Sequence, residues 1–351
     1  MTKTLVILGI DEDRNINTEF VDFLSLITID DRTKEIKILN INTKYTWYIQ
    51  KSNQYIPFKS LLVFYKTFYP QENYIESFIS AVEKLSSIRV DGYVVVTKNG
   101  LEELSPVISP VKVTAPSNLE DMDIPGYTIK KGENNLKETD ILKFVSADDN
   151  GDNDKLQRQL STIQSLITNF EIHKLFINQQ SIIEIVEKEM KTNLTGEDLL
   201  NLFIKLKLGQ YKFKVGYTDS TTAIQIENEL DERWYTVYNT LDKDIQKVYI
   251  NEDVKMEQAK IDIFNATNLP GLARSRARGL SNKGLRVVLV GNTDKKFEKT
   301  TIYLNTEKDY SNTLNEIYNT LDSNAIEIKH EKYDGRSVGD IVVVLGNNEI
   351  V

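Results

Sequence analysis

The middle of the chain carries the stretch Asp148-Asp149-Asn150-Gly151-Asp152-Asn153-Asp154-Lys155-Leu156-Gln157-Arg158-Gln159, which is acidic at its start and cationic at its end. Directly after it, the apolar residues Leu160, Ile163, Ile167 and Phe170 recur at helical spacing. A helix that packs one face against a core shows this spacing. The pattern predicts a helix over Arg158 to Phe170, with Arg158 and Gln159 in its first turn.

The acidic half of the stretch also allows a calcium-loop interpretation. Asp148, Asn150, Asp152 and Asp154 alternate along the chain, as the oxygen ligands of Ca²⁺ loops do. The stretch lacks the glycine placement and the distal glutamate of such loops. A solvated loop is therefore the better interpretation of this half.

Short apolar runs and polar turns alternate on both sides of this stretch. Strands are predicted at Leu5–Ile10, Phe23–Ile29, Ile36–Ile41, Tyr93–Val96 and Val111–Thr114, helices at Tyr74–Leu85, Ile182–Met190 and Glu197–Leu208, and a turn at Ile124–Tyr127. The polar segment 30–34 predicts a hairpin between the second and third strands. Strands mixed with helices in this way indicate an α/β or α+β layer fold.

The polar segment from Asn251 to Ala259 predicts a domain boundary, with one domain over 1–255 and a smaller α/β domain over 256–351. In the second domain, strands are predicted at Ile261–Phe264, Arg286–Val290, Thr301–Leu304, Ile326–Ile328 and Ile341–Leu345, and helices at Gly271–Lys283 and Asn312–Leu321. Gly284 stands where a glycine commonly ends a helix.

Composition indicates a folded globular chain of about two domains. Of its 351 residues, 40% are hydrophobic and 27% are charged, and the net charge is −9 without a dense block of lysine and arginine. A nucleic-acid-binding role is disfavoured, because such proteins present a basic surface. Since the sequence has no cysteine, disulfides, thiol nucleophiles and thiolate metal sites are excluded.

The sequence holds no apolar run near the roughly 18 residues needed to span a bilayer. Met1-Thr2-Lys3-Thr4 leads directly into the first predicted strand, so no signal peptide is recognised either. Two expectations follow. Either the protein is cytosolic, or an N-terminal membrane anchor belongs to a longer form of it.

Seven segments, in order along nearly the whole chain, resemble motifs of the LytR-CpsA-Psr family and of the LytR C-terminal domain. They are Leu8-Gly9-Ile10-Asp11, Val21-Asp22-Phe23-Leu24, the hairpin from Ile29 to Leu39, Val90-Asp91-Gly92-Tyr93, Ser109-Pro110-Val111-Lys112-Val113, the stretch from Phe144 to Gln159, and Phe264-Asn265-Ala266-Thr267-Asn268-Leu269-Pro270-Gly271-Leu272-Ala273. Each segment is short, and their order makes the resemblance fairly specific.

The resemblance implies a mixed central sheet flanked by helices, followed by a smaller α/β domain. It also implies transfer of a phosphoglycosyl group from a polyprenyl-pyrophosphate-linked glycopolymer to a hydroxyl of peptidoglycan. Such chemistry calls for Mg²⁺ held by one or two carboxylates, for arginines on the phosphate oxygens, and for an apolar tunnel for the lipid. The implied location is extracytoplasmic, with an N-terminal membrane anchor that this chain does not contain.

The functional residues of the family correspond to six positions of this sequence. The metal-binding carboxylates correspond to Asp11 and Asp22. The resemblance implies catalytic roles for Asp152, Lys155 and Arg158, and phosphate binding by Lys155, Arg158 and Gln159.

The arginines of the family's pattern are mostly replaced. Phe20, Thr43, Ser146 and Asp148 stand at four arginine positions and Lys155 at a fifth, which leaves Arg158 as the sixth. A lysine offers a point charge and not the planar fork that binds two oxygens. The replacements motivate a second hypothesis, a module that binds a polyprenyl lipid, a wall polymer or an envelope protein without catalysis. A cytosolic regulator is the third hypothesis.

For three other features we prefer a structural interpretation over a functional one. Arg274, Arg276 and Arg278 follow Pro270-Gly271 but spread around the predicted helix, which favours a solvated surface over an anion site. The aromatic residues at Trp47-Tyr48 and from Tyr55 to Tyr69 favour core packing over a lipid or sugar cleft. His173 and His330 are isolated in sequence, so no histidine-based catalytic or zinc arrangement is proposed.

Overall fold

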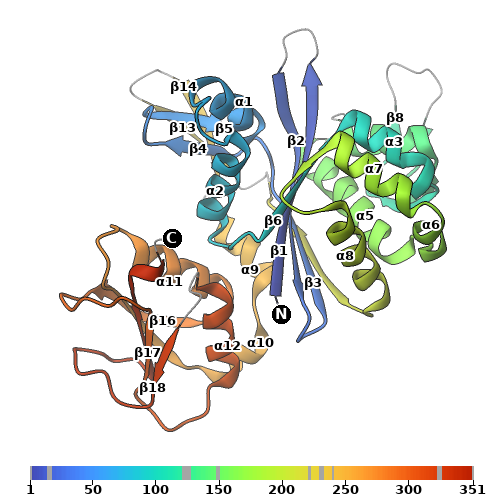
Figure 1. Cartoon of the computed structure of the whole chain (residues 1–351). Helices are drawn as coiled ribbons and strands as arrows, with labels where there is room; N and C mark the ends of the chain where they lie inside the picture. The colour runs from blue at the N-terminus through green and yellow to red at the C-terminus, as the bar shows by residue number, and fades with distance from the viewer. Residues whose placement is uncertain are drawn as a thin grey trace. The chain divides into compact units, whose positions relative to one another are not determined.

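The computed structural model describes residues 2–13, 18–120, 128–147, 151–219, 223–228, 233–238, 241–321 and 326–349. The chain divides into two compact units, Met1–Ala81 with Val90–Asp244, and Val82–Arg89 with Ile245–Val351. Each unit contains helices and a mixed sheet (Figure 1), so the α/β fold class with a second, smaller α/β part is confirmed. The boundary at residue 255 stays a prediction.

The first unit is built around a six-stranded sheet in the order β11-β6-β1-β2-β3-β12. Its strands are β1 (Thr2–Asp13), β2 (Thr18–Asp30), β3 (Glu35–Asn40), β6 (Gly92–Thr97), β11 (Met190–Thr192) and β12 (Lys212–Tyr217). β1 runs parallel to β6, and β3 runs parallel to β12, whereas the other neighbours are antiparallel. The hairpin predicted at 30–34 joins β2 to β3.

Helices cover both faces of this sheet (Figure 1). α1 (Phe58–Phe68) packs with the N-terminal part of α2 (Tyr74–Ser86) on one face, where Phe58 and Phe78 meet edge to face at 5.5 Å. The other face carries α3 (Lys98–Ile108), α4 (Glu138–Ser146), α5 (Asp152–Asn169), α6 (Ile172–Ile177), α7 (Gln179–Glu189) and α8 (Gly196–Leu208). Because both faces are covered, the central strands are nearly continuously apolar, and Leu24 and Leu26 are fully buried.

The remaining elements of the first unit are short pairs of strands and one helix at its end. They are β4 (Thr46–Ile49) with β5 (Gln54–Pro57), β7 (Val111–Ala115) with β10 (Gly132–Leu136), β8 (Leu119–Glu120) with β9 (Thr128–Ile129), β13 (Ala223–Asn228) with β14 (Arg233–Tyr238), and α9 (Leu241–Tyr249), which continues into the second unit. The aromatic run contributes to the core as preferred, since Phe58 is fully buried and Trp47 packs against it.

A β-bulge between β1 and β2 sets the direction of Asp22. Gly9 pairs with Phe23 and Ile10 pairs with Val21, so Asp22 is an extra residue with no partner in the ladder. Bulges re-aim side chains and are frequent beside functional sites. Gly9 has no side chain at this point, and a Cβ there would lie 2.9 Å from the Cβ of Phe23. The bulge thus needs a glycine opposite Phe23.

On the face covered by α1, Glu19 of β2 joins three elements. Its Oε1 accepts hydrogen bonds of 2.9 Å from Lys66 of α1 and from Lys191 of β11. Burial raises the pKa of Glu19, but the hydrogen bonds and charges of the two lysines outweigh burial and hold that pKa below its ordinary value.

We expect Glu19 to make the stability of the first unit pH-dependent. Since its pKa is lower in the folded state, Glu19 stabilises the fold above its unfolded pKa, and this contribution is lost as the pH falls through the folded pKa. Glu19→Gln should therefore lower the melting temperature at about pH 6, and this effect should become smaller as the pH is lowered toward about 3. Thermal denaturation across this range measures the difference, with Glu102→Gln on the exposed face of α3 as control. An equal loss at both pH values would contradict the assignment.

The second unit contains a five-stranded sheet in the order β16-β15-β19-β17-β18. Its elements are α10 (Glu252–Glu257), β15 (Lys260–Asn265), α11 (Leu272–Asn282), β16 (Arg286–Asn292), β17 (Thr301–Leu304), α12 (Ser311–Thr320), β18 (Glu327–Lys329), β19 (Ile341–Leu345) and the 3₁₀ turn Asn347–Glu349. Every predicted strand and helix of this part is present. Gly284 follows α11 with φ of 95°, a left-handed conformation that favours glycine.

The structure corrects the prediction for the central stretch. α5 begins at Asp152 and not at Arg158, so Arg158 and Gln159 lie in its second turn. Asp152 and Asp154 are therefore helical residues, so both the preferred solvated loop and the calcium-loop alternative are wrong for these two residues. Residues 148–150 and the turn predicted at 124–127 lie outside the described residues. The helices α1, α3, α4, α6, α9 and α10 were not predicted.

Candidate functional site

An apolar cavity of about 390 Å³ lies between the sheet and the helices of the first unit. Leu5, Ile7, Gly9 and Asp11 line it from alternate positions of β1, so it follows one face of that strand for about 20 Å at roughly 3.4 Å per residue. The helices contribute mostly leucine, isoleucine and phenylalanine side chains, such as Leu101, Ile163 and Phe203. A cavity of this shape accommodates an extended hydrocarbon chain.

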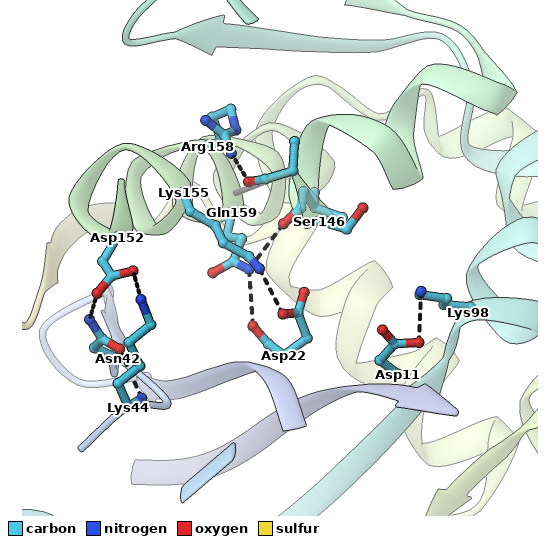
Figure 2. A network of polar contacts seen from close by, with 12 residues as sticks. Asp11, Asp22, Asn42, Lys44, Lys98, Ser146, Asp152, Lys155, Arg158 and Gln159 are labelled. Carbon is cyan, nitrogen blue, oxygen red and sulfur yellow. Dashed lines mark hydrogen bonds and ion pairs between the residues drawn. The ribbon is translucent and has the colours of Figure 1, made fainter. Parts of the chain in front are cut away.

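One end of the cavity, hereafter the polar end, is lined by Asp11, Asp22, Lys98, Ser146 and Gln159. It lies at the carboxyl ends of β1 and β6, which are parallel neighbours. Ligand sites of α/β proteins commonly lie outside such strand ends. Figure 2 shows the polar side chains of this region.

Asp22 and Lys155 form an ion pair beside the polar end. The Nζ of Lys155 donates to Oδ1 of Asp22 at 2.6 Å, and the two side chains are 11% and 26% exposed. Gln159, one turn further along α5, donates from Nε2 to the carbonyl oxygens of Asp22 and Val145 at 3.3 and 3.1 Å. The structure therefore brings three of the predicted site residues, Asp22, Lys155 and Gln159, into direct contact (Figure 2).

Asp11 lies at the same end of the cavity and is paired with Lys98. The Nζ of Lys98 is 2.7 Å from Oδ1 of Asp11, and the side chains are 44% and 49% exposed. The two predicted metal-binding carboxylates thus line one cavity from neighbouring strands, and each is neutralised by a lysine.

Arg158 points away from this arrangement. Its side chain is 1% exposed, its Nε donates to the carbonyl oxygen of Phe144 at 2.8 Å, and its other nitrogens donate to the carbonyl of Ala147 and to the carboxylate of Asp154. It fastens the end of α4 to α5. This geometry supports a structural role for Arg158, and its predicted contact with phosphate stays a prediction.

Asp152 belongs to a separate polar group at the start of α5 (Figure 2). Its carboxylate accepts hydrogen bonds from Nδ2 of Asn42 at 3.1 Å and from Nζ of Lys44 at 2.7 Å. Asn40 donates to the carbonyl of Leu156 in the next turn of α5 at 3.0 Å. The last residue of β3 and the segment after it thereby fix the first turns of α5, and Asp152 is one of the contacts.

The donor types of the polar end can be compared with those that a magnesium ion requires. Carboxylates of Asp11 and Asp22 are the type of donor that Mg²⁺ uses together with phosphate oxygens and water. Within the described residues, no group of three or more His, Asp or Glu side chains is placed to hold a metal. The residues present therefore fit Mg²⁺ held by one or two carboxylates and by the phosphate of a ligand.

Sequence reasoning missed Lys98 and Lys44. Neither belongs to a position where the resemblance expects a cation. A signal for Lys98 existed, because it lies two residues beyond the predicted strand Tyr93–Val96, and residues that follow parallel strands meet at one edge of the sheet. The pairing of Lys44 with Asp152 over 108 positions of sequence had no such signal.

Comparison with known families settles the relationship. A model of the LytR-CpsA-Psr family matches residues 2–251. The chain belongs to this family. Residues 258–348 match a second model, described as LytR cell envelope-related transcriptional attenuator. The resemblance inferred from the seven segments is therefore confirmed.

Solved structures of the same fold agree with this assignment. Bacillus subtilis TagV is 18% identical, with 69% of this chain and 93% of TagV covered and a TM-score of 0.54. A transcriptional regulator from Enterococcus faecalis is 16% identical over 81% of this chain and 88% of its own, with a TM-score of 0.53. TagT bound to LIIa-WTA is 19% identical over 73% of this chain and 89% of its own, with a TM-score of 0.50. At these identities the likeness shows a shared fold.

The curated proteins contain no significant match to this sequence. None of the helices in the described part of this LytR-CpsA-Psr protein has the length and apolarity needed to cross a membrane.

Proposed function

We propose that this protein binds a glycopolymer linked through phosphate to a polyprenyl lipid, with the lipid in the cavity and the phosphates at the polar end. The observation that carries the proposal is that an apolar cavity of about 390 Å³ has two carboxylates and two lysines at one end. These residues are Asp11, Asp22, Lys98 and Lys155. An anionic lipid has the same division into a hydrocarbon part and a charged part.

Family membership supports a role in the cell envelope. TagT, a structure of the same fold, has been solved bound to LIIa-WTA, which supports a wall glycopolymer as the ligand class. We propose an extracytoplasmic location for the chain, with a membrane anchor in the full-length protein.

The reaction that fits this site is phosphoglycosyl transfer to peptidoglycan. The oxygen of an acceptor hydroxyl would form a bond to the phosphorus that carries the glycopolymer, and the bond from that phosphorus to the bridging oxygen would break. Polyprenyl phosphate would leave with the electron pair, and the hydroxyl proton would pass to solvent. Mg²⁺ bound by Asp11 and Asp22 would neutralise charge on the phosphates. Lys155 would hold a phosphate oxygen.

Binding without transfer is a second candidate, and one observation favours it. Of the two cations kept at the family's arginine positions, Arg158 is buried against backbone carbonyls and Asp154, so Lys155 alone adjoins the polar end. Transition-state charge would then be stabilised by fewer donors than in the family's pattern.

Titration of geranylgeranyl diphosphate into the protein tests the proposal, with and without Mg²⁺. We expect saturable binding that Mg²⁺ strengthens, and at least tenfold weaker binding in the presence of Mg²⁺ for Asp22→Asn, because a metal ligand is lost. Asp334→Asn, which removes a lysine-paired carboxylate in the second unit, is the control. Binding that is absent in the wild type would reject the proposed function. Binding without turnover in a transfer assay with lipid-linked glycopolymer and peptidoglycan would favour the second candidate.

A further inference from the structure

We propose that Lys98 is a phosphate-binding residue of the polar end, and that it supplies there a positive charge that this chain lacks at the family's arginine positions. The inference rests on the proposed function, since it assigns a residue to the phosphate part of the same ligand.

The topology places Lys98 beside the phosphates. Thr97 ends β6 and forms with Ile10 the last pair of the parallel β1–β6 ladder, so the residues that follow, Lys98 and Asp11, lie at the same end of that ladder. Lys98 lines the cavity, and its ammonium group is 2.7 Å from the Asp11 carboxylate. A phosphate held near Asp11 through Mg²⁺ lies within reach of the same ammonium group.

Helix stability does not account for a lysine at this position. Lys98 is the first residue of α3, an 11-residue helix with no acidic residue in its first turn. A cation at a helix N-terminus opposes the helix dipole, where an acidic residue would be favourable. A residue that breaks a local rule in this way is often kept for function. Here the function is contact with Asp11 and with the phosphate of the ligand.

The ion pair of Lys98 is more exposed to water than that of Lys155. Lys98 and Asp11 are 44% and 49% exposed, whereas the Lys155 side chain is 11% exposed. Exposed pairs of this kind are weak because water screens them. When a phosphate arrives, Lys98 can exchange the carboxylate for phosphate oxygens and release Asp11 to a metal ion. The pair therefore neutralises both groups until ligand binds.

The charge balance of the polar end agrees with this role. Among the ion pairs of the described residues, removal of Lys98 would leave Lys155 to balance the carboxylates of Asp11 and Asp22, a net negative charge that disfavours an anion. With Lys98, the two lysines balance the two carboxylates. Mg²⁺ would then make the site cationic.

Calorimetric titration of Lys98→Met with geranylgeranyl diphosphate and with geranylgeraniol tests the inference. Loss of one charge-assisted hydrogen bond should weaken diphosphate binding about 10- to 100-fold, and alcohol binding should stay within about twofold because the cavity is unchanged. Lys98→Arg should restore most of the diphosphate affinity. Lys205→Met is the matched control, because Lys205 is 50% exposed and pairs with Asp31 at 2.7 Å on another part of the unit.

The outcomes are separable. Diphosphate binding that is equal in wild type and Lys98→Met overturns the role of Lys98 and leaves the proposed function standing. Equal weakening for the diphosphate and the alcohol also overturns it, since the variant would then have altered the cavity. A wild-type protein that binds neither compound rejects the proposed function together with this inference.

Discussion

Replacing Arg158 by methionine is expected to lower the free energy of unfolding of the first unit by about 3–5 kcal/mol, the usual effect of removing one partner of a buried ion pair. The guanidinium is 1% exposed and bonds to two backbone carbonyls and to Asp154, which is itself 13% exposed. Methionine fills most of the volume but leaves a carboxylate and two carbonyls without donors. The buried polar groups left behind cause the loss.

Chemical denaturation followed by circular dichroism measures this effect. Arg158→Lys keeps the charge near Asp154 but lacks the second and third donors of the fork, so we expect a smaller loss than for methionine. A variant with unchanged stability and at least tenfold weaker binding of geranylgeranyl diphosphate would instead place Arg158 on the ligand. That result would restore the role implied by the family pattern.

Replacing Ile163 by tryptophan is expected to weaken geranylgeranyl diphosphate binding at least 100-fold. Ile163 lines the cavity from α5, and an indole in its place would occupy the channel that the hydrocarbon needs. Because the channel is open space, the larger side chain should cost less than the roughly 1–3 kcal/mol typical of overpacking in a filled core. Titration with the diphosphate and a thermal melt on the same sample separate loss of binding from loss of folding.

Val215→Trp on β12 is the control for the added tryptophan, since Val215 is 40% exposed and is outside the cavity lining. It should leave affinity unchanged. If Ile163→Trp folds normally and still binds the diphosphate as tightly as the wild type, the hydrocarbon does not occupy this cavity. The phosphate groups would then have to bind without the lipid site, and the proposed function would need another ligand class.

Local patterns in the sequence determined much of the fold. The apolar runs at Leu5–Ile10 and Ile341–Leu345 became strands because continuous apolar residues are needed where a sheet is covered on both faces. The helical spacing of Tyr74–Leu85 became α2 for a similar reason. The predicted start of α5 at Arg158 was six residues too late. The first turns of this helix are polar, so the apolar spacing used for the prediction did not include them. Asn42 and Lys44 hold Asp152 there through contacts that no local pattern contains.

The sequence by itself determined the family and singled out Asp11, Asp22 and Lys155 as candidate site residues, because both inferences depend on residue type and on order along the chain. The tertiary structure decided where their side chains point. A bulge opposite Gly9 turns Asp22 toward the cavity, parallel pairing of β1 with β6 brings Lys98 to Asp11, and packing of α4 on α5 buries Arg158. Each of these outcomes depends on contacts between residues far apart in sequence. Strand register, strand order and burial are set only when distant segments pack together, so no local sequence pattern contains them.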